Sequence, residues 1–225
     1  MQVHGKPLAN RFAMQLHWKG GRVPKQVDHE ARRNQIAEAL MRLASKGGLE
    51  AVNLRDVAAE AGVSMGAVQH YFRSKDQMLT YAMEHANNRA AARIRQRLQS
   101  EPDRPSVRVI LRTLMVEMLA LSDDSRTEFL TAVAFFLRAL NSPDLAADYR
   151  KSWPQLEQWV ADELRRAQES GDLPPDRDVE KEAAALLLIP DGLSVGLLLG
   201  HRTGEQALEA IDYHLDRLFG KSTKD

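Results

Sequence analysis

Hydrophobic positions along the chain recur at the spacing of one helix face. Between residues 54 and 61 they occur at i, i+3, i+4 and i+7, and Gly62 follows directly. Such residues share one side of a helix, and glycine adopts a left-handed turn without a steric cost, so the pattern predicts a short helix that ends at Gly62. Ser64 can cap a second short helix, on which Val68 and Phe72 face inward.

Capping residues stand at the start of three consecutive helices. Asn53 and Ser64 precede the first two, and the segment Ser74-Lys-Asp-Gln77 has the form of a capping box at the start of the third. Two short helices around a tight turn form the helix-turn-helix unit, whose second helix enters the major groove of DNA. We therefore predict a DNA-binding head with three helices at residues 28–73.

Helical stripes separated by turn residues continue to the end of the chain. Ala and Leu together number 58, whereas Val, Ile and Thr number 25, which favours helix over strand. The predicted fold class is all-α, with a second helical domain at residues 74–225, and we expect residues 1–27 to be a disordered N-terminal extension. Helices after the head are expected at residues 74–100, 107–119, 129–140, 144–170, 179–200 and 204–219.

Charge is distributed unevenly, although the whole chain has 31 basic and 31 acidic residues. Residues 1–79 hold 12 Lys and Arg against 7 Asp and Glu, a net charge of +5, and residues 80–225 hold 19 against 24, a net charge of −5. A positive head on a negative body would orient the molecule toward phosphates. The chain has no cysteine and no visible secretory signal, so we expect a cytoplasmic protein.

The second short helix carries the candidate DNA contacts. Small residues at Gly66 and Ala67 would let the backbone approach the groove, and Gln69 and His70 offer donors and acceptors to base edges. Tyr71 is suited either to a phosphate contact or to packing inside the head. The full set of predicted DNA-binding residues is Asn53, Ser64, Met65, Gly66, Ala67, Gln69, His70, Tyr71, Arg73 and Lys75.

Residues 32–85 resemble the N-terminal domain of the TetR family of bacterial transcriptional regulators. The resemblance lies in Val57-Ala58-x-x-Ala61-Gly62-Val63-Ser64-x-Gly66 and in Tyr71-Phe72-x-Ser74-Lys75-Asp76-x-x-Leu79. Asn53 stands where the family usually has Thr, and Gln69 where it has an aromatic residue, so the resemblance does not identify the operator sequence. It implies a homodimeric repressor that binds a palindromic operator in double-stranded DNA and is released by a small-molecule effector.

The most apolar segment, residues 183–200, contains a single charge, Asp191. A membrane helix needs about 20 apolar residues and tolerates a central Asp poorly, so a helix buried by a second subunit is the favoured interpretation. With the apolar stripe of residues 204–219 it would form a four-helix interface, as TetR-like proteins do. The predicted interface residues are Leu187, Leu193, Leu197, Leu208, Ile211 and Leu215.

The resemblance further implies a ligand-binding cavity in the second domain. Met and aromatic side chains suit a pliable apolar cavity, although the same residues are also typical of a plain core. Asp191 can meet a polar or cationic group of the ligand, or cap a helix break at Pro190. The predicted ligand-binding residues are Met83, Met115, Met118, Phe136, Trp153 and Asp191.

The sequence offers two alternatives to a transcriptional regulator. Gly192-Leu-Ser194-Val-Gly196 fits the nucleophile elbow of serine hydrolases, with Asp212 and His214 in the expected order, but the elbow requires a strand and the pattern predicts no sheet. Small residues that let helices approach closely explain the same spacing. We therefore predict no catalytic residue, metal or cofactor. The other alternative is an all-helical adaptor that binds proteins through its head, and a salt-dependent shift of DNA in a gel would separate the two.

Overall fold

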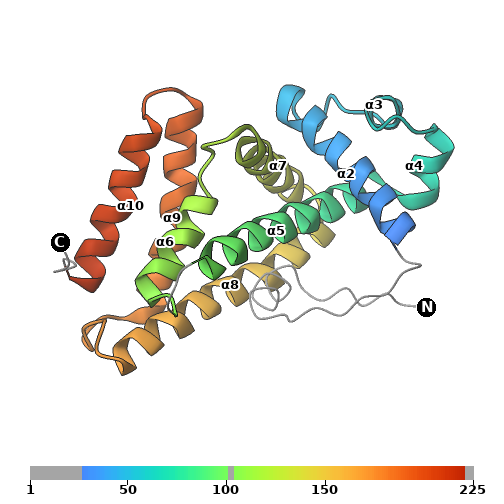
Figure 1. The fold of residues 1–225 in the computed structure, drawn as a ribbon. Coiled ribbons are helices and arrows are strands. Elements are labelled where there is room, and N and C mark those ends of the chain that lie inside the picture. Colours follow the sequence, from blue (N-terminus) through green and yellow to red (C-terminus); the bar gives the residue numbers. More distant parts are fainter. Residues whose placement is uncertain (1–26, 101–103, 221–225) are drawn as a thin grey trace.

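Helices joined by short turns make up the part of the chain that the computed structural model describes, residues 27–100 and 104–220 (Figure 1). This confirms the predicted all-α fold class. The predicted disordered extension lies almost wholly in residues 1–26, outside the described residues. The helices are α2 (Val27–Gly47), α3 (Leu54–Glu60), α4 (Met65–Tyr71), α5 (Lys75–Gln99), α6 (Val107–Glu117), α7 (Asp123–Ala139), α8 (Pro143–Glu169), α9 (Val179–Leu198) and α10 (Gly204–Phe219).

The predicted caps of α3 and α4 are confirmed. Asn53 Oδ1 accepts hydrogen bonds from the backbone N–H groups of Arg55 and Asp56 at 2.9 and 3.0 Å, and Asp56 Oδ2 accepts one from Asn53 N. Ser64 Oγ accepts a hydrogen bond from Ala67 N at 3.1 Å. These bonds satisfy N–H groups that have no partner inside the first turn of a helix, so both helices begin where the sequence predicts.

The cap of α5 differs from its prediction in one detail. Ser74 Oγ accepts a hydrogen bond from Gln77 N at 3.1 Å, as expected, but Gln77 Oε1 accepts from Arg73 N at 2.7 Å and not from Ser74 N. The Gln77 side chain therefore reaches one residue further back than a capping box requires. This bond ties α5 to the end of the helix-turn-helix unit.

Helix α5 belongs to the core of the head as well as to the core of the body. Its 25 residues span roughly 38 Å at 1.5 Å per residue. Met78 and Leu79 are buried against α2, whereas Ile94 is buried among the helices of the body. Phe135 of α7 and Leu145 of α8 also join the core of the head. The hydrophobic core of the head therefore extends well beyond residue 73.

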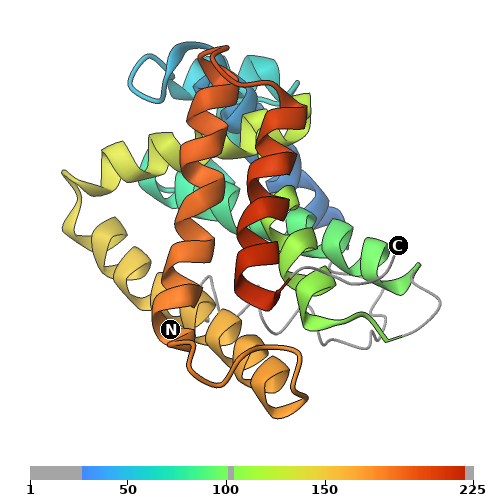
Figure 2. The ribbon, with the colours of Figure 1, turned by 90° about the vertical axis from the view of Figure 1, so that its left-hand side faces the viewer.

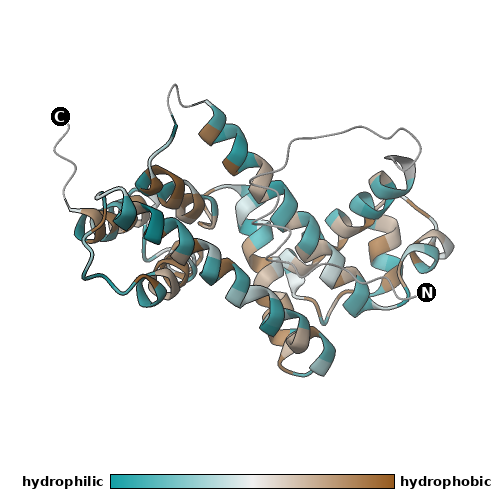
Figure 3. Cartoon of the chain, turned by 90° about the horizontal axis from the view of Figure 1, so that it is seen from below, coloured by the Kyte–Doolittle hydropathy of each residue, from teal (hydrophilic) through white to brown (hydrophobic). Residues whose placement is uncertain are grey.

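The body places α9 and α10 side by side at the end of the molecule opposite α3 and α4 (Figures 1 and 2). Helix α9 packs on α8, and α10 packs on α6. Hydrophobic and hydrophilic residues alternate around the helices (Figure 3), and the hydrophobic ones supply these contacts. Helices α8 and α9 continue through Pro154 and Pro190 without interruption. None of the helices in the described ranges is long and apolar enough to cross a membrane.

Candidate nucleic-acid interface and ligand cavity

Helix α4 is held from one side and open on the other. Val68 and Phe72 are buried in the core of the head, where they anchor the helix against its neighbours. Gln69, His70 and Arg73 are exposed, as are Met65 and Gly66 at the start of the helix. In Figure 1 α4 lies at the edge of the molecule. The side chains predicted to contact bases therefore face solvent on a helix that packing holds in place.

The turn between α3 and α4 depends on Gly62. Its φ of +63° lies in the left-handed region, which a residue with a Cβ adopts only at a steric cost. Val63 N then donates to Ala58 O at 2.9 Å, which closes the turn. Gly66 is different, because a Cβ built on it would meet only Ser64 Oγ, at 3.9 Å. The fold itself does not require a glycine at position 66, whereas close approach to a groove would benefit from one.

Tyr71 is half-buried and its hydroxyl lies 3.1 Å from His29 Nδ1 on α2. Its ring meets the ring of His70 edge-on, with centroids 5.1 Å apart. Tyr71 therefore packs within the head and also supports the side chain of His70. This geometry agrees with the packing alternative for Tyr71.

Residues 27–79 of the head carry no net formal charge. Residues 27–79 contain seven Lys and Arg and seven Asp and Glu, so the excess of +5 comes from residues 1–26, which contain five Lys and Arg and no acid. Within the described residues, Arg55, Arg73 and Lys75 have no ion-pair partner. Arg42, in contrast, pairs with Glu60 at 2.6 Å. These three unpaired side chains are therefore the candidates for phosphate contacts near α4.

A cavity of about 190 Å³ lies among α5, α6, α7, α8 and α9. Met83, Met118, Phe136, Trp153 and Asp191 line it, so the structure brings together five of the six predicted ligand-binding residues. The prediction for Met115 is wrong, because this side chain is buried in the hydrophobic core of the body. Successive residues lie about 100° apart around a helix, and the cavity face of α6 and its C-cap residue consists of Leu114, Glu117 and Met118.

Aromatic rings form one wall of the cavity. Tyr149 stacks on Trp153, with ring centroids 5.6 Å apart and an angle of 24° between the planes. Phe136 meets Tyr149 edge-on at 5.1 Å. The sequence prediction missed Tyr149, although its position four residues before Trp153 puts both on one face of α8. This spacing is the signal that would have identified it.

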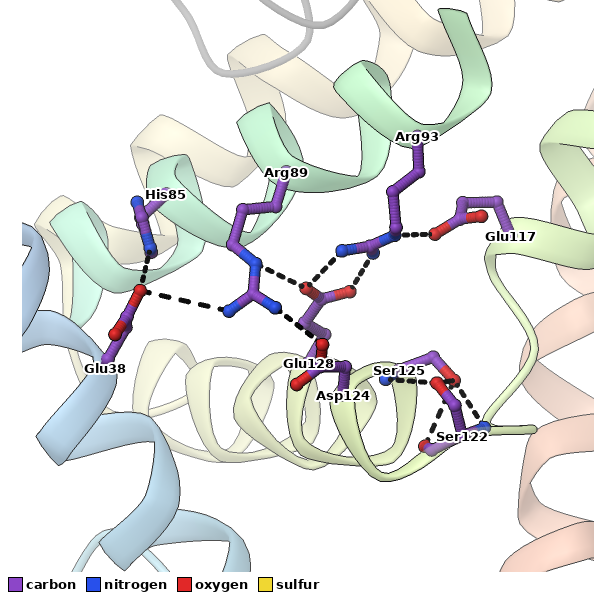
Figure 4. Close-up of polar contacts among 9 residues, drawn as sticks. All are labelled: Glu38, His85, Arg89, Arg93, Glu117, Ser122, Asp124, Ser125 and Glu128. Carbon is purple, nitrogen blue, oxygen red and sulfur yellow. Dashed lines mark hydrogen bonds and ion pairs between the residues drawn. The ribbon is translucent and has the colours of Figure 1, made fainter. Parts of the chain in front are cut away.

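Two of the acidic side chains that line the cavity are bound by arginine (Figure 4). Arg93 donates to Glu117, and its two terminal nitrogens donate to Glu128 at 2.5 and 3.1 Å. Arg97 adds a second ion pair to Glu117 at 2.7 Å. Sequence reasoning missed these pairs. The repeat of Arg89, Arg93 and Arg97 at four-residue spacing on α5 would have predicted a basic stripe facing acids of other helices.

The ion pairs continue from the cavity to the head (Figure 4). Arg89 binds Asp124 at 2.8 Å and lies 3.7 Å from Glu128 and 3.9 Å from Glu38 of α2. His85 Nε2 is 3.0 Å from the same Glu38 carboxylate. A chain of charged contacts therefore joins the wall of the cavity to the first helix of the head.

Asp191 is the acidic residue of the cavity without such a partner. It is half-buried and makes neither an ion pair nor a hydrogen bond with another described side chain. Burial raises the pKa of its carboxyl group above the ordinary value. Burial, and next the negative charge of Asp191, raise the pKa of the Tyr149 hydroxyl to about 12. Because α9 continues through Pro190, there is no helix break for Asp191 to cap.

Four of the six predicted interface residues of α9 and α10 face the core of their own chain, whereas for the partly exposed Leu197 and Leu208 the interface stays a prediction. Leu187, Ile211 and Leu215 are fully buried within the chain, because α9 and α10 use that face to pack on α8 and α6. Leu193 is also buried, and Leu197 and Leu208 pack at the edge of the same core. A side chain without accessible surface cannot contact a second subunit. Exposed apolar residues stand on the outer face: Leu188, Val195 and Leu199 on α9 and Tyr213 on α10.

Ser194 is a packing residue in the middle of α9. It is fully buried, and its Oγ accepts a hydrogen bond from Ala120 N at 3.1 Å and donates one to Met118 O at 3.4 Å. Asp212, the second member of the hydrolase motif, is held by Arg112 at 2.6 and 2.9 Å. A nucleophile elbow needs a strand, a sharp turn and an exposed serine, and the segment around Ser194 in α9 has none of these.

Among the described residues we also find no cluster of His, Asp and Glu that would bind a metal.

Comparison with known proteins agrees with this geometry. The family model of the bacterial regulatory proteins of the tetR family matches residues 36–82, and that of the BetI-type transcriptional repressor C-terminal domain matches residues 107–220. The HTH-type transcriptional regulator PksA of Bacillus subtilis is 30% identical over 177 residues, which cover 79% of this chain and 83% of PksA.

Solved structures give the same result. A transcriptional regulator from Rhodococcus sp. is 31% identical with a TM-score of 0.68, over 83% of this chain and 95% of the other. A regulator from Saccharomonospora viridis in complex with choline is 25% identical with a TM-score of 0.68, over 84% and 94% of the two chains. Helix-turn-helix geometry and similarity over both parts of the chain lead to one conclusion: this protein belongs to the TetR family of DNA-binding transcriptional regulators.

Proposed function

We propose that this regulator is a repressor, that it binds a palindromic operator as a homodimer, and that it leaves the operator when a small molecule occupies the cavity. The exposed face of α4 carries the proposal. Val68 and Phe72 hold the helix from inside, while Gln69, His70 and Arg73 remain free to enter a major groove. Since its DNA partner lies in the bacterial cytoplasm, we expect the protein to act there, and as a regulator without catalytic activity.

The outer face of α9 supports a homodimer. Ala185, Leu188, Gly192, Val195 and Leu199 follow one another at intervals of three and four residues, which gives a continuous apolar stripe. Leu188 is 62% exposed and Leu199 is 74% exposed, and a Cβ on Gly192 would meet no atom within 4 Å. A twofold axis at this face would pair two heads for two half-sites of a palindrome, about 34–36 Å or a multiple apart.

The position of the cavity supports control by a ligand. Three of the helices around it, α5, α6 and α7, are joined by the ion pairs of Arg89 and Arg93. Arg89 also lies within ion-pair distance of Glu38 in the head. A ligand that shifts these helices would change the spacing of the two heads. The choline complex of the Saccharomonospora viridis regulator is a further reason to propose a small-molecule effector.

A first experiment selects DNA fragments with the purified protein and then compares binding to the selected duplex and to a random duplex. We expect Gln69→Ala to weaken binding to the selected duplex by about 1–3 kcal/mol and to leave random binding nearly unchanged, because a base contact provides discrimination. Gln96→Ala, an exposed glutamine of α5 far from α4 in sequence, is the matched control. An equal loss on both duplexes would contradict base recognition by Gln69.

Lys75→Ala tests the phosphate contact in the same assay. Loss of one cation should weaken binding to both duplexes and lower the slope of log affinity against log salt by about one unit, because one fewer counterion is released. The measurement is a salt titration of the wild-type protein and of Lys75→Ala, from dilute to physiological salt. An unchanged slope for Lys75→Ala would show that Lys75 does not contact a phosphate.

A further inference from the structure

The cavity has an unbalanced negative charge. Glu117, Glu128 and Asp191 line it, and no described lining residue is a Lys, Arg or His. Arg93 approaches from α5 and binds both glutamates, and Arg97 also binds Glu117. The negative charges of these two glutamates are therefore neutralised by arginines that do not themselves line the cavity. Asp191 lines the cavity from α9 and has no such cation among the described residues.

A half-buried carboxylate without a partner destabilises the empty protein. Removing a charged group from water costs free energy, and this cost is offset when a cation or hydrogen-bond donor lies next to the charge. Because no described side chain supplies one to Asp191, an occupant of the cavity that carries a positive charge would gain this interaction. An anionic ligand would meet Asp191 with a like charge and is disfavoured.

The aromatic wall favours the same kind of occupant. The faces of Phe136, Tyr149 and Trp153 carry partial negative charge, and a cation within about 6 Å of a ring centroid is attracted to it. The three rings form a connected series, edge-on and then stacked, on two helices next to the cavity. Tyr149 and Asp191 line the same cavity. Carboxylate and rings therefore surround one region.

A metal ion does not fit this region. Metal ions in proteins need several oxygen, nitrogen or sulfur ligands at short distance, and the described residues contain no group of three or more His, Asp and Glu placed to supply them. Met83, Met118 and Phe129 add apolar surface to the cavity. An ion that carries its charge on an apolar body satisfies both the carboxylate and the apolar surface.

We infer that the cavity binds an organic cation, an amine or quaternary ammonium ion, with Asp191 as its counter-ion and the rings of Phe136, Tyr149 and Trp153 around its charged group. The inference rests on the proposed function, because it takes the occupant of the cavity to be the effector. It names the class of that effector, and it identifies Asp191 as the residue that selects for charge.

Calorimetry on the full chain with matched ligands tests the inference. The probes are choline, the larger tetraethylammonium ion, and the uncharged isostere of choline in which carbon replaces nitrogen. We expect at least one of the two cations to bind ten times more tightly than the isostere. Equal binding of cation and isostere, or no binding of either cation, would overturn the inference.

Two variants assign the selectivity to Asp191. Asp191→Asn keeps the shape of the side chain and removes its charge, so it should lose the tenfold preference for the cation. Asp148→Asn, an exposed aspartate of α8, should keep it. Thermal unfolding of each variant verifies that it folds. If folded Asp191→Asn retains the preference, Asp191 is not the counter-ion.

Binding of the selected duplex, measured without ligand on the same samples, separates this inference from the proposed function. Loss of the cation preference while DNA binding persists overturns the inference alone. Failure of the wild-type protein to bind any duplex overturns the proposed function, and calorimetry still reports the cation preference. A bound cation that leaves DNA affinity unchanged would contradict its role as effector.

Discussion

At the scale of single residues, buried charge distinguishes function from packing in this protein. Glu117 is almost fully buried, yet Arg93 and Arg97 compensate it, and it joins α5 to α6. Asp191 is half-buried and uncompensated, and burial raises its pKa. Proteins retain such unfavourable groups where a ligand requires them, and the cost appears as lower stability of the empty form.

We therefore predict that Asp191→Asn raises the stability of the ligand-free protein at pH 7. The folded-state pKa of this acid lies above its unfolded value, so the folded state binds the proton more tightly, and stability falls as the pH rises through the window between the two values. Urea unfolding at pH 7 and at mildly acidic pH measures the effect. The advantage of Asp191→Asn should be largest at pH 7 and shrink as the wild-type carboxyl becomes protonated.

The same comparison has a simple control. Asp148→Asn changes an exposed carboxyl and should leave stability nearly the same at both pH values. A lower stability of Asp191→Asn at pH 7 would mean that the wild-type carboxylate makes a favourable contact inside the protein.

Residue roles were predictable from the sequence to different degrees. Gln69 and His70 could be placed on the open face of α4 because Val68 and Phe72 fix the rotation of that helix. Met115 was misplaced because Met and Leu residues follow one another on several sides of α6, so periodicity alone does not decide which side meets a cavity. The pairing of Glu117 and Glu128 with Arg93 depends on tertiary contacts that no local pattern specifies.

At the scale of secondary-structure elements, helix ends were more predictable than helix faces. The caps at Asn53 and Ser64 act within three residues, so the local sequence determines them. Helix α9 is apolar on most sides, and the sequence therefore did not show which side packs inward. Leu187 is buried and its neighbour Leu188 is 62% exposed, although both are leucines.

The exposed stripe of α9 leads to a prediction about assembly. Leu188→Glu and Leu199→Glu introduce charge into an apolar surface that we expect to be buried between two chains, so each should shift the protein from dimer to monomer. Sedimentation equilibrium measures the mass, and circular dichroism should show unchanged helix content. Leu140→Glu, at an 81% exposed leucine directly after α7, should remain dimeric. A dimer that survives both α9 substitutions would exclude this face.

At the scale of the whole molecule, α5 connects the head, the cavity and the body. It begins at the helix-turn-helix unit and contributes first to the core of the head and then to the core of the body (Figure 1). Between Met83 and Ile94 it also lines the cavity. Its length was predictable from the absence of breakers between residues 75 and 99. Its shared membership of two cores was not, because Phe135 and Leu145 meet the head only after the chain has folded back.

The central claim is that the exposed face of α4 contacts DNA. Hydrogen exchange of the full chain, measured alone and with the selected duplex, tests this claim most directly. We predict slower exchange of the amides in α4 and at the start of α5 when DNA is bound, and no change in α10, which lies at the opposite end of the molecule (Figure 1). Unchanged exchange in α4 while the protein is bound to the duplex would contradict the account.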